Sequence, residues 1–147
     1  MHKLVRGPEP TCLRQYRDSG ITWEDELNDK ASVHEALQEM QGYFCAYCEA
    51  SIKNHDNRHI EHFRKRQRFP QKTFEWANLF WSCSNSCSCG QHKDARATGA
   101  YSPEDLIKPD EEDPEEYFLF LKTGFIKIKE GISPAMRHRA EETLRVF

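Results

Sequence analysis

Two cysteine clusters, Cys45-Ala-Tyr-Cys48 and Cys83-Ser-Asn-Ser-Cys87-Ser-Cys89-Gly90, decide the fold of this chain. A gap of two residues lets both sulfur atoms of a pair reach one tetrahedral zinc ion, and a second cluster completes the four ligands. The sequence therefore predicts a structural zinc site, with a redox-active pair or a set of buried thiols as the alternative.

The second cluster offers three sulfur atoms for two ligand positions. Cys83 and Cys87 have the more usual gap, but Gly90 follows Cys89 and frees the chain to turn its N–H groups toward the sulfur. We predict that Cys89 is the fourth ligand, with Cys87 as the alternate. Four thiolates leave no open position for water, so this zinc is expected to be structural; its predicted ligands are Cys45, Cys48, Cys83 and Cys89.

Composition places the chain among small globular proteins. Its 147 residues suit one domain, and 37% hydrophobic residues supply a modest core. There is no apolar run of membrane length and no signal-peptide core, so we expect a cytoplasmic protein with no membrane contact. Thiols stay reduced in that compartment, and this favours metal binding by the six cysteines over disulfides.

Charge is strongly segregated although the net charge is only −3. Arg58–Lys72 holds six Lys and Arg against one acid, and Glu104–Glu116 holds eight acids against one Lys. The basic stretch is a candidate for phosphate contacts, with a solvated loop as the alternative. The acidic stretch repels nucleic acid and is expected to face solvent or a basic partner.

Turn and capping signals divide the chain into elements. We predict an irregular N-terminal arm over 1–21 and a single domain over 22–147, with its core at 43–98. A short helix is expected from Thr22 to Asn28. Ser32 and Glu35 form a capping box for a helix that ends at Gly42. Strand residues are expected around Tyr43–Phe44 and His59–Phe63, a helical turn or short strand at 73–81, and a short helix at 91–98.

The last third of the domain, 102–147, is predicted to be an acidic linker, a hairpin and a helix. The segments 117–121 and 125–129 flank Lys122-Thr-Gly124 and are typical of a β-hairpin. Ser133 and Pro134 then begin a C-terminal helix as N-cap and first helical residue.

Histidines and acids gather beside the cysteine clusters. Hydrolysis of a phosphodiester requires a water to lose its proton and charge to be stabilised at the leaving oxygen. A neutral His62 is suited to be the base, while Glu61 and His92 can hold a hard divalent ion. The alternative is that they are surface or packing histidines, as we expect for His34, His55 and His138.

Several cations are suited to contact phosphate. Arg58, Arg64 and Lys65 can follow a nucleic-acid backbone, together with Arg66 and Arg68. Lys93 or Arg96, at the start of a helix, can hold the scissile phosphate. His59 is a further candidate as a metal ligand or phosphate contact. The aromatic residues Trp76, Phe80 and Trp81 are expected to pack in the core rather than stack on bases.

These residues together resemble a known motif. The strings that carry the resemblance are Cys45-Ala-Tyr-Cys48-Glu49, Ile60-Glu61-His62-Phe63-Arg64, Trp76-Ala-Asn78-Leu79 and Cys89-Gly90-Gln91-His92-Lys93-Asp94. They look like the HNH endonuclease motif. With Asp105-Leu-Ile-Lys-Pro-Asp110, the stretch from Gly42 to Ser133 resembles the PtuB-type HNH nucleases of Septu and retron anti-phage systems, which accompany an ABC-type ATPase, PtuA.

The resemblance implies a fold and a set of roles. It implies an α+β fold with a ββα-metal core (His-Me finger, HNH) and a structural zinc, flanked by helices and a C-terminal hairpin. His62 would be the general base, Glu61 and His92 ligands of a catalytic Mg²⁺ or Mn²⁺, and Asn78 a brace for the loop that holds the base. The implied function is a nucleic-acid endonuclease that works with the ATPase in anti-phage defence.

Two other functions remain open. A non-catalytic zinc-finger adaptor that binds nucleic acid or the ATPase would keep the zinc cysteines but need neither Glu61 nor His92. A toxin-like nuclease acting alone is disfavoured by the appended acidic segment and hairpin, which indicate docking to a partner. Nothing in the sequence distinguishes DNA from RNA as the target.

Overall fold

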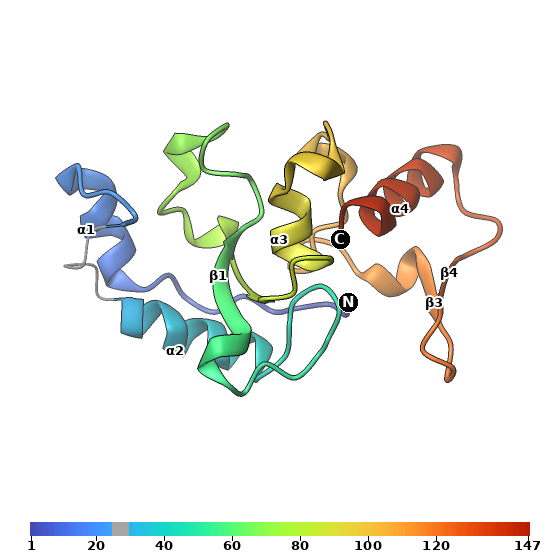
Figure 1. The fold of residues 1–147 in the computed structure, drawn as a ribbon, viewed down its shortest axis with the longest axis horizontal. Helices are drawn as coiled ribbons and strands as arrows, with labels where there is room; N and C mark the ends of the chain where they lie inside the picture. Colours follow the sequence, from blue (N-terminus) through green and yellow to red (C-terminus); the bar gives the residue numbers. More distant parts are fainter. Residues whose placement is uncertain (25–29) are drawn as a thin grey trace.

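The computed structural model describes residues 1–24 and 30–147, and it has a mixed α+β fold (Figure 1). The helix expected over Thr22–Asn28 falls largely outside these residues. No helix in the described part of the chain combines the length and apolar character needed to cross a membrane. Short 3₁₀ turns join the main elements at His55–Asn57, Pro70–Lys72, Trp76–Asn78, Arg96–Thr98, Pro103–Asp105 and Pro114–Glu116.

A two-stranded antiparallel sheet lies at the centre of the molecule. Strand β1 (Arg58–His62) pairs with β2 (Leu79–Cys83), so that Arg58 lies opposite Cys83 and His62 opposite Leu79. Helix α3 (Cys89–Asp94) follows β2. Every residue of β2 is buried, and Trp76 in the preceding turn is buried too, which confirms the expectation that these aromatic side chains pack in the core.

Helix α2 (Lys30–Gln41) is fixed to β2 by its last side chain. The Gln41 amide donates to the carbonyl oxygens of Phe44 and Trp81, each at 3.0 Å, and accepts from the N–H of Trp81 at 2.8 Å. The helix ends at Gly42 as predicted, with φ at 62°. It begins at Lys30, however, so the capping box predicted at Ser32 is wrong; Ser32 lies within the helix.

The N-terminal segment is not irregular as expected. Residues Thr11–Ser19 form helix α1, which Gly20 ends with φ at 69°. Its buried residues are Cys12, Leu13 and Tyr16, a spacing that places them on one helical face. The short apolar stripe was too small to stand out from the sequence.

The C-terminal part confirms the predicted hairpin and helix. Strands β3 (Phe118–Phe120) and β4 (Ile126–Ile128) pair antiparallel. Helix α4 (Pro134–Val146) begins at Ser133, whose hydroxyl accepts from the N–H of Met136 at 3.2 Å. The end of α4 returns to the centre of the molecule beside α3 (Figure 1), where the carbonyl of Phe147 accepts from the N–H of Cys89 at 2.7 Å.

The acidic segment is tied into the fold rather than left facing solvent as expected. Asp110 is 5% exposed and accepts from Nε of Arg6 at 2.7 Å. The same guanidinium donates to the carbonyl oxygens of Trp76 (2.7 Å) and Leu79 (3.1 Å), and lies 4.6 Å from the rings of Trp76 and Phe80. Arg6 therefore joins the N-terminal segment, the acidic segment and the start of β2.

Replacing Arg6 with methionine is expected to lower the free energy of unfolding by about 3 kcal/mol, because it leaves Asp110 buried without its main partner. Lys72→Met breaks an ion pair with Glu75 in which both side chains are more than a third exposed. That control should cost less than about 1 kcal/mol. Urea denaturation of the two variants measures the difference, and equal losses would show that Arg6 has no special role.

Candidate metal and active site

The four predicted zinc ligands come together. The Sγ atoms of Cys45, Cys48, Cys83 and Cys89 all lie within 4.8 Å of one another, and those of Cys48 and Cys83 are 3.9 Å apart. Sulfur atoms held tetrahedrally at ~2.3 Å from zinc are roughly 3.8 Å apart. This cluster can therefore hold a metal ion such as zinc.

Cys87 stays outside the cluster because of how the chain turns after it. Its thiol is exposed and lies 3.8 Å from the hydroxyl of Ser86. Cys89 takes φ of 58°, in the left-handed region, and this turns its sulfur inward. The expectation that Gly90 supplies the turn is thus wrong. A Cβ on Gly90 would lie 2.5 Å from Oε2 of Glu61, so Gly90 makes room for that carboxylate.

The sulfur atoms of the cluster lie close enough to change one another's pKa values. Hydrogen bonds from Cys48 and Cys89 lower the pKa of Cys45, while the same contacts raise the pKa of Cys48 to about 11 and raise that of Cys89 as well. The close approach of these sulfurs therefore favours a thiolate at Cys45 and opposes one at Cys48 and Cys89. Zinc binds thiolates, so its binding to such a cluster would release protons.

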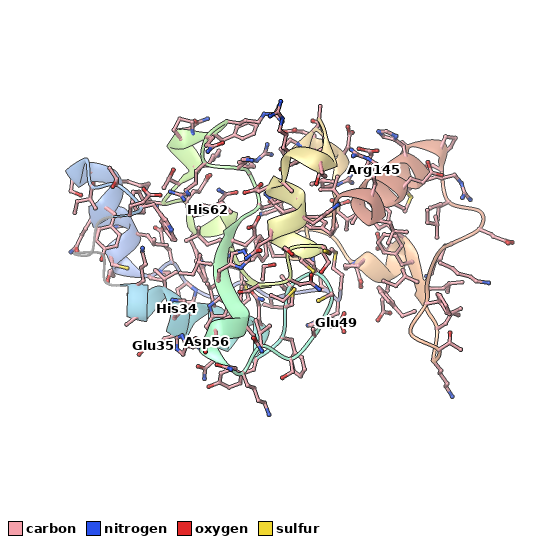
Figure 2. All side chains as sticks on the ribbon, in the orientation of Figure 1. His34, Glu35, Glu49, Asp56, His62 and Arg145 are labelled. Carbon is pink, nitrogen blue, oxygen red and sulfur yellow. The ribbon has the colours of Figure 1, made fainter. Side chains whose placement is uncertain are left out.

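A surface pocket of about 440 Å³ lies where β1 meets α3, and it contains the predicted acid and base. Its lining includes His59, Glu61, His62, Lys65 and Asp94. Figure 2 shows His62 at the end of β1 that lies away from Asp56. The neighbours Glu61 and His62 therefore contribute to one pocket, as the sequence predicted.

Glu61 is the buried carboxylate of this pocket. Its Oε1 lies 2.9 Å from Nζ of Lys93, and its Oε2 lies 3.4 Å from Nε2 of His59. Burial raises the pKa of Glu61, but the hydrogen bond from His59 and the charge of Lys93 outweigh it, and the pKa lies below its usual value. Glu61 is therefore ionised at neutral pH even though it is only 4% exposed.

Lys93 holds two carboxylates at once. Its ammonium is buried and lies 2.5 Å from Oδ1 of Asp94 as well as beside Glu61. Burial opposes the charge of Lys93, yet these two acids raise its pKa above the ordinary value. Burial and the nearby Glu61 raise the pKa of Asp94 in turn. Carboxylate oxygens are the ligands that hard divalent ions prefer, so Glu61 and Asp94 suit such an ion.

His62 is held as a neutral imidazole. It is 5% exposed, and its Nε2 lies 3.0 Å from the carbonyl oxygen of Thr73, with the Trp23 ring edge-on at 4.5 Å. A carbonyl oxygen only accepts, so Nε2 carries the proton and Nδ1 keeps its lone pair. Burial lowers the pKa of His62 to about 4. This side chain can accept a proton at neutral pH.

Asn78 makes the contacts expected of a brace. Its Oδ1 accepts from the N–H of Arg64 at 2.7 Å, and its Nδ2 donates to the carbonyl oxygens of Arg64 (3.1 Å) and Lys72 (2.9 Å). Its own carbonyl accepts from the N–H of Phe63 at 2.9 Å. The loop that follows His62 is therefore fixed at both ends by one buried side chain.

His92 lies elsewhere than the sequence predicted. It does not line the pocket, and its Nδ1 donates to the carbonyl oxygen of Val146 at 3.0 Å. Gly90, Lys93 and Asp94 share one face of α3 by helical spacing, and this face meets Glu61. His92 falls outside that face. The spacing from Gly90 was the signal that could have selected Asp94 instead.

The predicted phosphate-contacting cations divide into separate groups. His59 and Lys65 line the pocket, and Arg66 does too. Arg58 instead lies 4.2 Å from the Trp81 ring and donates to the carbonyl oxygen of Ile52, so it serves packing. Arg64 pairs with Glu104 at 2.5 Å. Arg96 lines a neighbouring pocket.

Comparison with known proteins supports the resemblance. No protein-family model matches the chain. The chain is similar to the Septu protein PtuB of Bacillus mycoides (strain KBAB4). The two are 29% identical over 141 aligned positions, which cover 79% of this chain and 46% of the relative. The chain thus spans about half the length of this relative, and the similarity confirms the PtuB-type resemblance that the motifs indicated.

The cysteine cluster predicts that one zinc ion binds per chain and that Cys89, not Cys87, holds it. Cys89→Ser should lose zinc and melt at a lower temperature, because metal binding contributes directly to folding. Cys87→Ser is the matched control and should keep both zinc and melting temperature. Zinc analysis and thermal denaturation of the two variants check this, and the reverse pattern would move the fourth ligand to Cys87.

The burial of His62 predicts that its ring does not titrate near pH 6.5. The unfolded chain takes up the proton at that pH and the folded one only near 4, so stability is full above about pH 6.5. It falls by up to about 3 kcal/mol as the pH decreases toward 4. An NMR titration of the His62 ring without added divalent ion measures the midpoint, and a midpoint at 6.5 or above would contradict the buried neutral state.

Proposed function

We propose that this chain is a metal-dependent endonuclease of the HNH type, which hydrolyses phosphodiester bonds in nucleic acid. One observation carries the proposal: Glu61 and His62, adjacent at the end of β1, line the same pocket, and His62 keeps an unprotonated Nδ1. The order β1, β2, α3 beside the cysteine cluster supports a ββα-metal core.

In this proposal the chain's own groups activate water and hold the phosphate. Nδ1 of His62 takes the proton of the attacking water, while Nε2 stays bonded to Thr73 and fixes the ring. Asn78 keeps the loop after His62 in place. Lys65, which lines the pocket, attracts the scissile phosphate.

A catalytic Mg²⁺ or Mn²⁺ ion fits the acids of the pocket. Glu61 and Asp94 would hold it, and when bound it would stabilise negative charge on the phosphate and the leaving oxygen. His92 joins them only if its hydrogen bond to Val146 breaks. Cleavage is expected to leave a 5′-phosphate and a 3′-hydroxyl.

We also propose that the chain acts in anti-phage defence together with an ABC-type ATPase. Similarity to the Septu protein PtuB supports this role. The hairpin offers a surface for such a partner, because Leu119, Phe125 and Ile126 are among its exposed apolar side chains. Apolar side chains gathered on a soluble surface are typical of an interaction site.

A zinc-finger adaptor without catalysis is the second candidate. It is favoured by the ion pair of Glu61 with Lys93, which occupies the carboxylate that a catalytic ion needs. Within residues 1–24 and 30–147, moreover, the four cysteines are the one set of three or more metal-binding side chains already gathered around a point. The adaptor would bind nucleic acid or the ATPase equally well after Glu61 and His62 are replaced.

The nuclease hypothesis predicts that His62→Ala lowers the cleavage rate at least ~100-fold, because general-base catalysis contributes about that much. Zinc content should not change. His138→Ala, an exposed histidine far along the chain, is the matched control and should cleave like wild type. The assay uses DNA and RNA, with and without Mg²⁺ and the ATPase of the same system.

Two results would decide between the candidates. Equal cleavage by wild type and His62→Ala, with zinc retained, would refute the assigned base. No cleavage by wild type under any of these conditions, with binding retained when Mg²⁺ is left out, would favour the adaptor.

A further inference from the structure

A second surface pocket adjoins the first along α3. It has a volume of about 270 Å³ and shares Lys65 and Asp94 with the first pocket. The rest of its lining comes from Arg68, Lys93, Ala95, Arg96, Gly99 and Tyr101. A ligand that reaches from one pocket to the other would pass directly over Lys65.

The two pockets carry opposite charge. Three carboxylates line the first, Glu24, Glu61 and Asp94, against the two cations Lys65 and Arg66. The second pocket has a single carboxylate, Asp94, against the cations Lys65, Arg68, Lys93 and Arg96. The first pocket therefore attracts a cation and the second an anion.

Most of the charge in the second pocket is uncompensated. Lys65 donates to the backbone carbonyl of Asp94 at 2.7 Å, and Arg68 to that of Tyr101 at 3.0 Å. In the described part of the chain, the side chain of Arg96 makes no ion pair or hydrogen bond, and only its backbone carbonyl accepts, from Gly99. Other cations of the fold instead hold carboxylates, among them Arg6, Arg64, Arg66, Arg139 and Arg145.

We infer that the second pocket binds a backbone phosphate next to the scissile one on the same nucleic-acid strand. This inference rests on the proposed nuclease function and adds a subsite to it. The guanidinium groups of Arg68 and Arg96 match the non-bridging oxygens of a phosphate diester. Lys65 would lie between the two phosphates and keep the strand in register with His62. Binding of this kind does not depend on base sequence.

Binding of an oligonucleotide to the zinc-loaded chain, without Mg²⁺ or Mn²⁺, tests the pocket without catalysis. Arg68→Gln and Arg96→Gln should each weaken binding several-fold and reduce the slope of log K against log salt by roughly 0.7 to 0.9. Arg137→Gln removes the same charge from an exposed position on α4, outside both pockets, and should leave the slope unchanged. Equal slopes for all the variants and the wild type would overturn the inference.

A neutral methylphosphonate, moved one linkage at a time along the oligonucleotide, locates the phosphate. At one position the methylphosphonate should weaken binding by the wild type. At that same position it should not weaken binding by Arg96→Gln any further, because the two changes remove the same contact. Independent effects at every position would contradict the assignment. If inorganic phosphate binding is lost in Arg96→Gln while no methylphosphonate matters, the pocket serves free phosphate and the inference fails.

These measurements separate the subsite from the function it serves. If the methylphosphonate and Arg96→Gln effects on binding coincide but the chain never cleaves, the phosphate site is supported and the nuclease proposal is refuted. If the chain cleaves and KM is unchanged in Arg68→Gln and Arg96→Gln, the nuclease proposal is supported and the subsite is refuted.

Discussion

The gathering of four cysteine sulfurs is the constraint from which the rest of the site follows. Cys83 ends β2, and Cys89 begins α3, so the cluster fixes the strand and the helix relative to each other. Pairing of β2 with β1 then places Glu61 opposite Phe80. The start of α3 decides which of its residues meet Glu61. The cysteine cluster thus sets the relative positions of side chains that are far apart in the sequence.

Two cations, the partly buried Arg6 and the buried Lys93, organise the charge around this frame. Arg6 satisfies Asp110 and two backbone carbonyls, and Lys93 satisfies Glu61 and Asp94. A charge taken out of water is costly unless an opposite charge lies beside it, and these ion pairs supply one. As a result, two adjacent residues of the pocket differ in charge at neutral pH: Glu61 is ionised, whereas burial keeps His62 neutral. Adjacent groups held in different protonation states are what acid–base chemistry requires.

Features set by local chemistry could be predicted from the sequence. The gathering of cysteines follows from their two groups in the sequence, although the reason for choosing Cys89 was wrong. The end of α2 follows from Gly42, and the start of α4 from Ser133 and Pro134. The motif indicated Asn78 and the Glu61–His62 pair; in the structure Glu61 and His62 line one pocket, and Asn78 contacts the loop that follows His62. The predicted elements of the hairpin also match, because turn residues act over a few positions.

What the sequence could not reveal depends on distant partners. The acidic segment looked solvated because Arg6, the partner of Asp110, lies in the N-terminal segment. Helix α1 buries too few residues to be seen against its arginines. The resemblance indicated His92 rather than Asp94, and the spacing from Gly90 favours Asp94 only once the contact of Gly90 with Glu61 is known. In each case the outcome depends on contacts between segments that are distant in the sequence, and the residue types alone do not indicate these contacts.

The contact between Gly90 and the carboxylate of Glu61 has a consequence for how sequences of this kind can diverge. Any residue with a side chain at position 90 would force the carboxylate of Glu61 to move from its place beside Lys93. A shorter acid at position 61 would withdraw its oxygens and open that space. Positions 90 and 61 are therefore expected to covary. A homologue with alanine at the position of Gly90 should have aspartate at the position of Glu61.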